Sequence, residues 1–421
     1  MQTVSSCLQK DIQASLRHNI TVNMIDGAFF GFGLGFASFI TIIPLFVSQM
    51  TDSAILIGLI PAIHSVGWQL PQLLTAGWVS RMKRYKPAML LMTIHERVPF
   101  LGLAAVAWIF SGKDNSLALI LTFLMLVWQG LGGGFAGNPW QSMIAKIIPL
   151  RYQGTFFGGQ AALMNGMASI SAILAGIILT RLDSPQDFTW LFLLAGASLT
   201  ISFSAITLTR EPEDTEKIIP EKKVPFWSGT RTIWRRDGNF RNFMFSRILM
   251  PFATMGYAFY IVYCTQALGM DEFTAGVLTS VLLVTQIIAS PLMGWLGDRL
   301  GHHNMLKVGV LASSLSSLLA WWAPSLVWFY FIMVLTGVSM VAVWTTAMTM
   351  SVQFGAETHR PTYIGMSNSL LAPATLLAPI FGGWLADTLS YQITFIASAG
   401  FGFVTLVILQ IFFKKTRLLK S

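Results

Sequence analysis

Four ionisable side chains interrupt the long apolar segments of this 421-residue chain. They are Asp26, Glu96, Arg97 and Arg247. A charged group at the centre of a membrane-crossing helix costs at least about 2.5–3.5 kcal/mol, so it persists where it is paired or has a function. A buried carboxyl group can bind and release a proton, and a guanidinium group can hold an anion. We therefore expect these four residues to take part in substrate binding or ion coupling.

The run His95-Glu96-Arg97 lies near the middle of its apolar segment. Successive residues of a helix point about 100° apart, so these side chains are not expected to share one face. Glu96 and Arg97 are expected to find partners on different helices, with Glu96 as the protonation site. The alternative is a structural network that fixes this segment against the apolar segments before and after it. For His64 the sequence favours a hydrogen-bonded packing role over ligand binding.

A second group of side chains combines amides with aromatic rings. Its members are Gln129, Asn138, Trp140, Gln141, Tyr257 and Tyr260. Tyr257 and Tyr260 are three residues apart and share one helix face. Rings with apolar faces and amides that fix orientation suit a cavity for an amphipathic or hydroxylated organic molecule. The same residues also suit interfacial aromatic belts and hydrogen bonds between helices, and the sequence leaves both interpretations open.

The elements that would position these side chains are helices that cross a bilayer. Such a helix needs about 20 mostly apolar residues. We predict twelve spans, with the approximate limits 20–48, 54–79, 88–111, 116–145, 155–180, 188–209, 240–267, 273–297, 305–323, 325–350, 362–386 and 390–413. In span 4, Gly130, Gly133, Gly134 and Gly137 form two pairs of small residues at a spacing of four, which predicts close helix packing.

The basic residues test this count of spans. If the N-terminus is cytoplasmic, 23 of the 27 Lys and Arg residues lie in or at the edge of cytoplasmic segments. The predicted outer loops contain only Lys113 and Arg181. Cytoplasmic loops of membrane proteins are enriched in Lys and Arg. The bias therefore predicts an all-α integral membrane protein of the cell membrane with both termini in the cytoplasm.

Composition excludes several other classes of protein. Hydrophobic residues make up 54% of the chain and charged residues 11%, against about a quarter charged in ordinary soluble domains. The net charge of +9 follows from the loop pattern, so no nucleic-acid partner is expected. We find no phosphate-binding loop, no metalloprotease motif and no nucleophile elbow. Cys7 and Cys264 form no metal pattern. The sequence thus predicts no enzyme activity, no cofactor and no bound metal.

One long polar stretch divides the chain. Residues 210–239 are rich in charge and contain three prolines, and they separate six predicted spans from six. The expected domains are an N-terminal bundle over 1–209, a cytoplasmic linker over 210–239 and a C-terminal bundle over 240–421. An amphipathic surface helix is possible near 226–236.

The two halves repeat weakly. Gly154-Thr155 returns as Pro361-Thr362 with an offset of 207 residues, and Gly77-Trp78 returns as Gly294-Trp295 with an offset of 217. Two six-helix halves in parallel orientation predict a pseudo-twofold axis along the membrane normal, with the substrate site near the midplane.

At this point the chain resembles the major facilitator superfamily. The resemblance covers essentially the whole sequence and is sharpest at Gly294-Trp-Leu-Gly-Asp298-Arg299-Leu-Gly301-His-His, between spans 8 and 9. This string is similar to the superfamily's cytoplasmic loop G-x-L-a-D-R-x-G-R/K-R/K. The resemblance implies a gating role for Gly294, Asp298, Arg299 and Gly301. An Asp at this place can accept from backbone N–H groups at a neighbouring helix N-terminus and latch the cytoplasmic side shut. A static topology lock is the alternative.

The departures from the family pattern are equally specific. In the corresponding first-half loop Arg81 stands where the superfamily has the Asp, so no anionic latch is expected there. In span 4 Leu126 stands at the place of an Arg that is associated with proton coupling in many relatives. Spans 1 and 7 face each other in the superfamily, so we expect Asp26 and Arg247 to pair, or to compete for substrate and proton. The alternative is a permanent structural ion pair, or separate side chains that each reach toward the membrane surface.

These observations predict a secondary active transporter. It would move a small organic solute by alternating access and couple this movement to protons, with export of amphipathic compounds slightly favoured. Uptake of a sugar-like molecule or metabolite, by symport or facilitated diffusion, is the alternative. A non-transporting receptor or lipid scramblase on the same fold is an alternative from another class. The expected partners are the substrate, protons and the lipid bilayer, and the chain is expected to act as a monomer.

Overall fold

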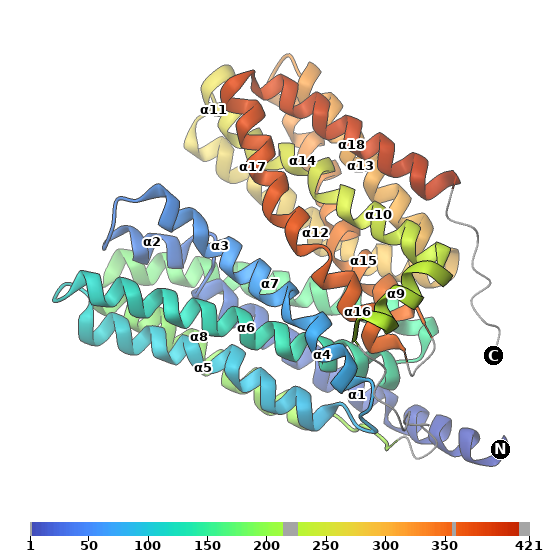
Figure 1. Ribbon diagram of the computed structural model, residues 1–421. Helices are drawn as coiled ribbons and strands as arrows, with labels where there is room; N and C mark the ends of the chain where they lie inside the picture. Colours follow the sequence, from blue (N-terminus) through green and yellow to red (C-terminus); the bar gives the residue numbers. More distant parts are fainter. Residues whose placement is uncertain (1, 214–225, 356–358, 412–421) are drawn as a thin grey trace. The chain divides into compact units, whose positions relative to one another are not determined.

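The computed structural model describes residues 2–213, 226–355 and 359–411. Its first half contains α1 (Gln2–Phe36), α2 (Ile42–Ser48), α3 (Ala54–Gln69), α4 (Pro71–Val79), α5 (Lys86–Phe110), α6 (Asn115–Ile147), the 3-10 helix η1 (Leu150–Tyr152), α7 (Gln153–Arg181) and α8 (Gln186–Thr207). Helix α9 (Phe226–Arg236) follows (Figure 1). The centre of the predicted linker, residues 214–225, lies outside the described residues.

The second half begins with α10 (Gly238–Ala253), the 3-10 helix η2 (Met255–Phe259), α11 (Tyr260–Leu268) and α12 (Glu272–Leu300). It continues with α13 (His302–Trp322), α14 (Val327–Val341), the π-helical turn η3 (Ala342–Thr346) and α15 (Ala347–Gln353). It ends with α16 (Arg360–Ser369), α17 (Ala372–Thr388) and α18 (Tyr391–Ile411). The described residues form helices and connecting turns, with no strand among them.

The predicted spans agree with this architecture. Within the described part of the chain, ten helices are long and apolar enough to cross a membrane, and each matches one predicted span. Residues 412 and 413, at the end of the predicted twelfth span, lie outside the description. The other two predicted spans, 20–48 and 54–79, correspond to α1 with α2 and to α3 with α4. The all-α membrane fold expected from the sequence is therefore confirmed.

Predicted spans 1 and 2 differ from the structure at three places, each for a physical reason. Helix α1 begins at Gln2, well before the apolar run starts, because a helix can continue into water beyond its membrane-crossing part. Span 1 then breaks between α1 and α2, where the Ser38 hydroxyl accepts from the backbone N–H groups of Ile40 and Thr41. Span 2 breaks before Pro71, which has no N–H to continue the helix.

Packing divides the chain into two compact units. Unit 1 comprises Met1–Pro149, Gln160–Pro220 and Gly355–Ser369. Unit 2 comprises Leu150–Gly159, Glu221–Phe354 and Leu370–Ser421. Each unit thus contains one short segment from the other half of the sequence. In unit 1, α16 packs on α4 and α6; in unit 2, η1 packs on α12.

Inside unit 1, α5 packs between α6 and α8, α1 packs on α8, and α3 packs on α6 (Figure 1). Glycines permit the closest approach, as the spacing in span 4 predicts. A Cβ atom on Gly134 would overlap the carbonyl oxygen of Gly67 and the ring of Pro71. One on Gly130 would lie 3.0 Å from the carbonyl oxygen of Ile63. Helix α6 therefore rests directly on the backbone of α3 and α4.

Replacing Gly134 by Ala is expected to destabilise the protein by about 1–3 kcal/mol, because the added methyl group overlaps backbone atoms that cannot move alone. Gly166 is the matched control, since a Cβ atom there meets nothing within 4 Å. Its replacement by Ala is expected to be neutral or stabilising by up to about 1 kcal/mol. The thermal unfolding midpoints of the two detergent-solubilised variants make the comparison. Equal midpoints would contradict this packing.

Candidate functional site

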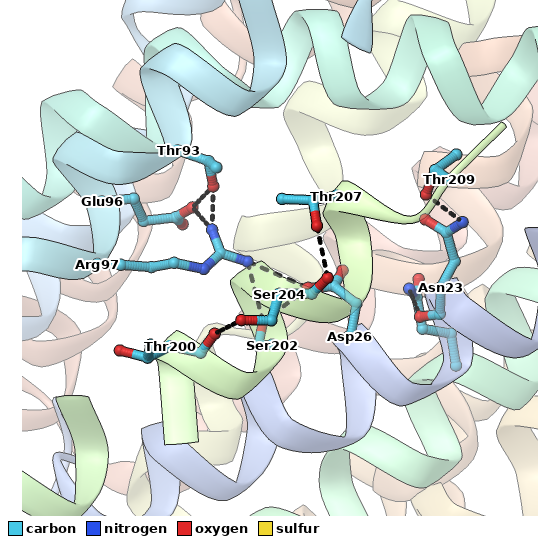
Figure 2. A network of polar contacts seen from close by, with 11 residues as sticks. Asn23, Asp26, Thr93, Glu96, Arg97, Thr200, Ser202, Ser204, Thr207 and Thr209 are labelled. Carbon is cyan, nitrogen blue, oxygen red and sulfur yellow. Dashed lines mark hydrogen bonds and ion pairs between the residues drawn. The ribbon is translucent and has the colours of Figure 1, made fainter. Parts of the chain in front are cut away.

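A buried ionic network connects three helices of unit 1. Arg97 of α5 lies at its centre, and its Nη2 atom is 3.1 Å from Asp26 Oδ1 of α1 (Figure 2). The same nitrogen donates to the Ser202 hydroxyl of α8 at 3.0 Å, and that hydroxyl donates to Asp26 Oδ1 at 2.6 Å. The other arm of the guanidinium group, Nη1, lies 3.5 Å from Glu96 Oε2 and donates to the Thr93 hydroxyl. Helices α1, α5 and α8 therefore share one polar centre.

The network is buried and holds more negative than positive groups. The side chains of Asp26, Arg97 and Glu96 are 8%, 8% and 11% exposed. The face of Phe30 covers the guanidinium group, with a centroid distance of 5.3 Å. Attraction between opposite charges is several times stronger in such surroundings than in water. Two carboxyl groups share one guanidinium group, so the centre carries a net charge of −1 unless a proton or another cation binds.

The structure gives Asp26 a partner within unit 1 and corrects one expectation at this site. Asp26 pairs with Arg97, and its expected pairing with Arg247, which lies in unit 2, stays a prediction. Arg97 finds partners on the other helices α1 and α8, as expected, but the contacts of Glu96 are with Thr93 and Arg97 of its own helix α5. The Cα–Cβ bonds of Glu96 and Arg97 point about 100° apart around the helix, but both side chains are long enough to meet. The network also connects span 3 to spans 1 and 6. The structural network that was the alternative in the sequence analysis would have connected span 3 to spans 2 and 4.

Arg247 lies in unit 2, on α10. Its Nη1 atom donates to the Ser351 hydroxyl of α15 at 2.7 Å, and its guanidinium group lies 5.8 Å from the ring centroid of Phe243. The Arg247 residue is 4% exposed. It joins α10 to α15 within this unit.

The predicted amides are buried in interhelical hydrogen bonds. Gln72 is the hub: its Oε1 atom accepts from Asn368 Nδ2 of α16 at 2.6 Å and from Gln141 Nε2 of α6 at 3.2 Å. Asn138 Nδ2 donates to the backbone carbonyl groups of Gln72 at 2.8 Å and Pro361 at 2.9 Å. We refer to Gln72, Asn138, Gln141 and Asn368 as the amide cluster. It binds α16 to α4 and α6, and Gln72 and Asn368 were not identified from the sequence.

The remaining predicted residues also have protein partners. Gln129 Oε1 lies 3.0 Å from Nδ1 of His64, whose ring stacks on Phe39, in agreement with the packing role expected for this histidine. Trp140 is half-buried on α6. Tyr260 is fully buried, and its hydroxyl lies 3.1 Å from that of Ser317. Tyr257 packs against Tyr260 with a ring separation of 5.5 Å. Interhelical packing, one of the two interpretations left open, thus accounts for Gln129 and Tyr260.

Asp298 occupies a helix N-terminus in unit 2. Its Oδ1 atom accepts from the Gly154 N–H at 2.8 Å, and Oδ2 accepts from the Thr155 N–H at 2.7 Å and the Thr155 hydroxyl at 2.6 Å. These donors are in the first turn of α7, where the free N–H groups and the helix dipole favour an anion. Glycine at 294 permits the approach, since a Cβ atom there would overlap the Gly154 carbonyl group. This is the contact that the loop motif predicts.

The rest of the motif surrounds that contact. Asp298 lies in the last turn of α12 and not beyond it, and Gly301 makes the turn into α13 with φ +94°. His302 Nε2 is 3.2 Å from Asp298 Oδ1, and both side chains are 6% exposed. Arg299 lies over the Trp295 ring, 4.0 Å from its centroid. His302 therefore contacts the anion from a place where the family pattern has Arg or Lys.

The comparisons with known proteins agree with this geometry. Residues 243–420 match the family model described as Major Facilitator Superfamily. The second half of the chain thus matches the major facilitator superfamily. The resemblance noted from the sequence is thereby confirmed. The superfamily's members in these comparisons are transporters, which agrees with the expectation that the chain is not an enzyme.

Among sequence relatives, the class H tetracycline resistance protein of Pasteurella multocida is 27% identical over 142 residues. That match covers 34% of this chain and 35% of the relative, so it spans about a third of the relative's length. A bacterial homologue of the iron transporter ferroportin in an outward-facing state has the same fold, with 13% identity, a TM-score of 0.74 and coverage of 93% and 98% of the two chains. The Escherichia coli fucose:proton symporter FucP is similar at 15% identity, a TM-score of 0.73 and coverage of 93% and 98%.

A second carboxylate at a helix N-terminus was missed by the sequence reasoning. Glu211, at the start of the linker, accepts from the N–H groups of Tyr85 at 2.9 Å and Lys86 at 2.7 Å, at the N-terminus of α5. Lys146 Nζ lies 3.1 Å from Glu211 Oε1, and the two side chains are 7% and 1% exposed, respectively. An acidic residue close to the end of span 6 was visible in the sequence, but its partners are 125 and 65 residues away. The linker is therefore anchored to unit 1 by a buried ion pair.

Replacing Asp298 by Asn should loosen the first turn of α7, because one of the two charged acceptor oxygens becomes an amide donor. We expect backbone amide exchange at Gly154 and Thr155 to become about tenfold faster, as a loss of one charge-assisted hydrogen bond implies. Asp271→Asn, at the other end of α12, is the control because Asn also caps helices. Unchanged exchange in Asp298→Asn would show that the contact does not hold α7.

Replacing Glu211 by Gln should leave Lys146 buried without its counter-charge and destabilise the protein by about 3–5 kcal/mol. Glu213→Gln is the matched control two residues later. Its ion pair with Arg84 is 3.6 Å long between half-exposed side chains, and such pairs contribute about 0–1 kcal/mol. Thermal unfolding in detergent compares the two variants. A similar small effect for both would contradict the anchoring role.

Proposed function

We propose that the chain is a secondary active transporter that moves a small organic solute across the cell membrane by alternating access and couples this movement to protons. The network of Asp26, Glu96 and Arg97 carries the proposal. A superfamily member that buries two carboxyl groups around one guanidinium group has a natural binding site for one proton. The protein would act as a monomer with both termini in the cytoplasm.

Within the network the proton is assigned to Glu96. Asp26 has the shorter ion pair, at 3.1 Å, and accepts an additional hydrogen bond from Ser202. Glu96 has the longer pair, at 3.5 Å, and among the described residues it also accepts a hydrogen bond from the Thr93 hydroxyl. The carboxylate that loses least attraction on protonation is the better proton carrier. Asp26 would then remain the permanent counter-ion of Arg97.

The proposed coupling follows from this division of roles. A proton on Glu96 neutralises the centre and releases one arm of the guanidinium group. Loss of this proton restores the net charge of −1, and the carboxylate of Glu96 then attracts Arg97 again. Because Arg97 also holds α1 and α8, the protonation state biases how these helices are held against α5. A ligand that favours one of the two arrangements would be linked to the proton by the same free energy.

Asp298 and the amide cluster are proposed to act as gates. The anion at the α7 N-terminus and the amides that hold α16 each bind a segment from one sequence half to helices of the other. An alternating-access cycle requires such contacts to break and re-form. The class of solute is proposed to be amphipathic and organic, with export favoured. The name of the Pasteurella relative, which records tetracycline resistance, supports this choice.

The proposal is tested with two variants in proteoliposomes. A thermal-shift screen of tetracyclines, lipophilic cations and hexoses first identifies a bound compound, since a ligand at 100 times its Kd stabilises by about 2.7 kcal/mol. Transport of that compound is then measured with and without an imposed pH gradient. We expect Glu96→Gln to bind the compound and to exchange it across the membrane, but to lose accumulation driven by the gradient.

The control is Asp52→Asn, which removes an exposed carboxylate from the loop between α2 and α3 and should accumulate the compound normally. Gradient-driven accumulation that survives in Glu96→Gln would show that Glu96 does not carry the coupling proton. Binding without any flux in the unsubstituted protein would favour the receptor alternative over a transporter.

A further inference from the structure

Helix α9 (Phe226–Arg236) presents a basic surface immediately before a helix pair that is apolar enough to cross a membrane. Arg231, Arg235 and Arg236 are exposed, and they occur within six consecutive residues. The helix ends just before Gly238, where the apolar helix pair Gly238–Leu268 begins. A helix so close to the start of a span must lie near the level of the lipid headgroups.

The opposite side of α9 is fixed to the protein. Trp234 packs on Phe245 of α10 with a ring separation of 5.7 Å and an interplanar angle of 68°. Arg241 Nη1 donates to the Trp234 carbonyl group at 3.3 Å. Thr230 is buried, and Ile233 and Trp234 are partly buried. The apolar side of the helix thus packs on α10, and its basic side is exposed.

The arginines are arranged on both flanks of the apolar side. At about 100° per residue, Arg231 and Arg235 lie on one flank, and Arg236 lies on the other flank beyond Ile233. Basic residues on either side of an apolar stripe are typical of helices that lie in the plane of a membrane surface. Their long stems can follow the apolar surface while the charged ends reach the headgroups.

No acidic side chain neutralises this surface among the described residues. None of the ion pairs found there includes Arg231, Arg235 or Arg236. The acidic residue nearest in sequence, Asp237, uses its carboxylate to accept from the Phe240 N–H at 2.9 Å, which caps α10. Guanidinium groups bind phosphate through paired hydrogen bonds, so the chemistry that fits this surface is a phosphate monoester or diester.

We propose that α9 binds the headgroups of anionic phospholipids in the leaflet on the linker's side of the membrane. Arg231, Arg235 and Arg236 contact the lipid phosphates, and Trp234 with Phe245 holds the helix at the required depth. The occupant is lipid because the helix directly precedes a span and the basic residues flank its apolar side. The inference depends on the membrane position of α10 and is independent of the transported solute.

Backbone amide exchange over α9 tests the inference in the full-length protein. The protein is placed in nanodiscs of phosphatidylcholine alone or of an equal mixture with phosphatidylglycerol. Each basic residue near an anionic surface contributes roughly a fivefold change in binding, so exchange over 230–236 should slow by at least about tenfold in the anionic nanodiscs. High ionic strength should remove the difference, because it screens the attraction.

The variant Arg231→Gln/Arg235→Gln/Arg236→Gln should show equal exchange in both lipids. The matched control, Lys10→Gln/Arg17→Gln/Lys83→Gln, removes the same charge from exposed positions that are not on an amphipathic helix with aromatic anchors. It should keep the lipid dependence. Loss of the dependence in the control, or none in the unsubstituted protein, overturns the proposal. Slow, salt-sensitive exchange already in phosphatidylcholine also overturns it, because it would mean that acidic residues of the protein itself cover the arginines.

Discussion

The structure depends on one constraint: in apolar surroundings every polar group must find its partner within the protein, because water is absent. The broken helices show how the chain meets it. At the break in span 7 the Ala253 carbonyl group has no helical partner, and the hydroxyls of Ser313 and Ser398 donate to it at 2.8 and 2.7 Å. At the break before Pro71, the Ser369 hydroxyl donates a shared hydrogen bond to the carbonyl groups of Gln69 and Leu70. At these two breaks a hydroxyl group from a neighbouring helix satisfies the irregular backbone.

The same constraint explains why three of the four charged residues predicted inside the spans, Asp26, Glu96 and Arg97, are gathered in one network. A single buried Arg97 would be strongly unfavourable, and removal of one partner from such a pair typically costs about 3–5 kcal/mol. Asp26 and Glu96 supply the counter-charge from two helices, and Ser202 completes the hydrogen bonding from a third. A centre of this kind is held firmly while its charges balance and changes its contacts when they do not. This sensitivity makes it suitable for coupling to a proton.

Anions at helix N-termini form a second theme. Asp298 occupies the first turn of α7 and Glu211 the first turn of α5, each accepting from two backbone N–H groups. The first half of the chain has Arg81 at the position equivalent to Asp298, and there the segment α16 is held by neutral amides instead. The two halves therefore solve the same structural problem with different chemistry. Contacts made by the carboxylates respond to salt and to protonation, whereas the amide cluster does not carry charge.

The twelve apolar runs, the polar linker and the positive loops were sufficient to predict an all-α membrane protein, and the motif at Gly294–His303 added the resemblance to the major facilitator superfamily. The fold prediction succeeded because hydropathy and loop charge are summed over many residues. The contact of Asp298 could also be predicted, because it follows from a local motif and from the general affinity of helix N-termini for anions. The partners of Asp26, Gln72 and Glu211 could not be predicted in this way. Each partner lies 65 or more residues away, and its choice depends on which faces of two helices meet. Composition and periodicity therefore decide that a helix crosses the membrane, while only packing decides which side chains meet inside it, because a rotation of a helix by one residue changes every partner without changing its hydropathy.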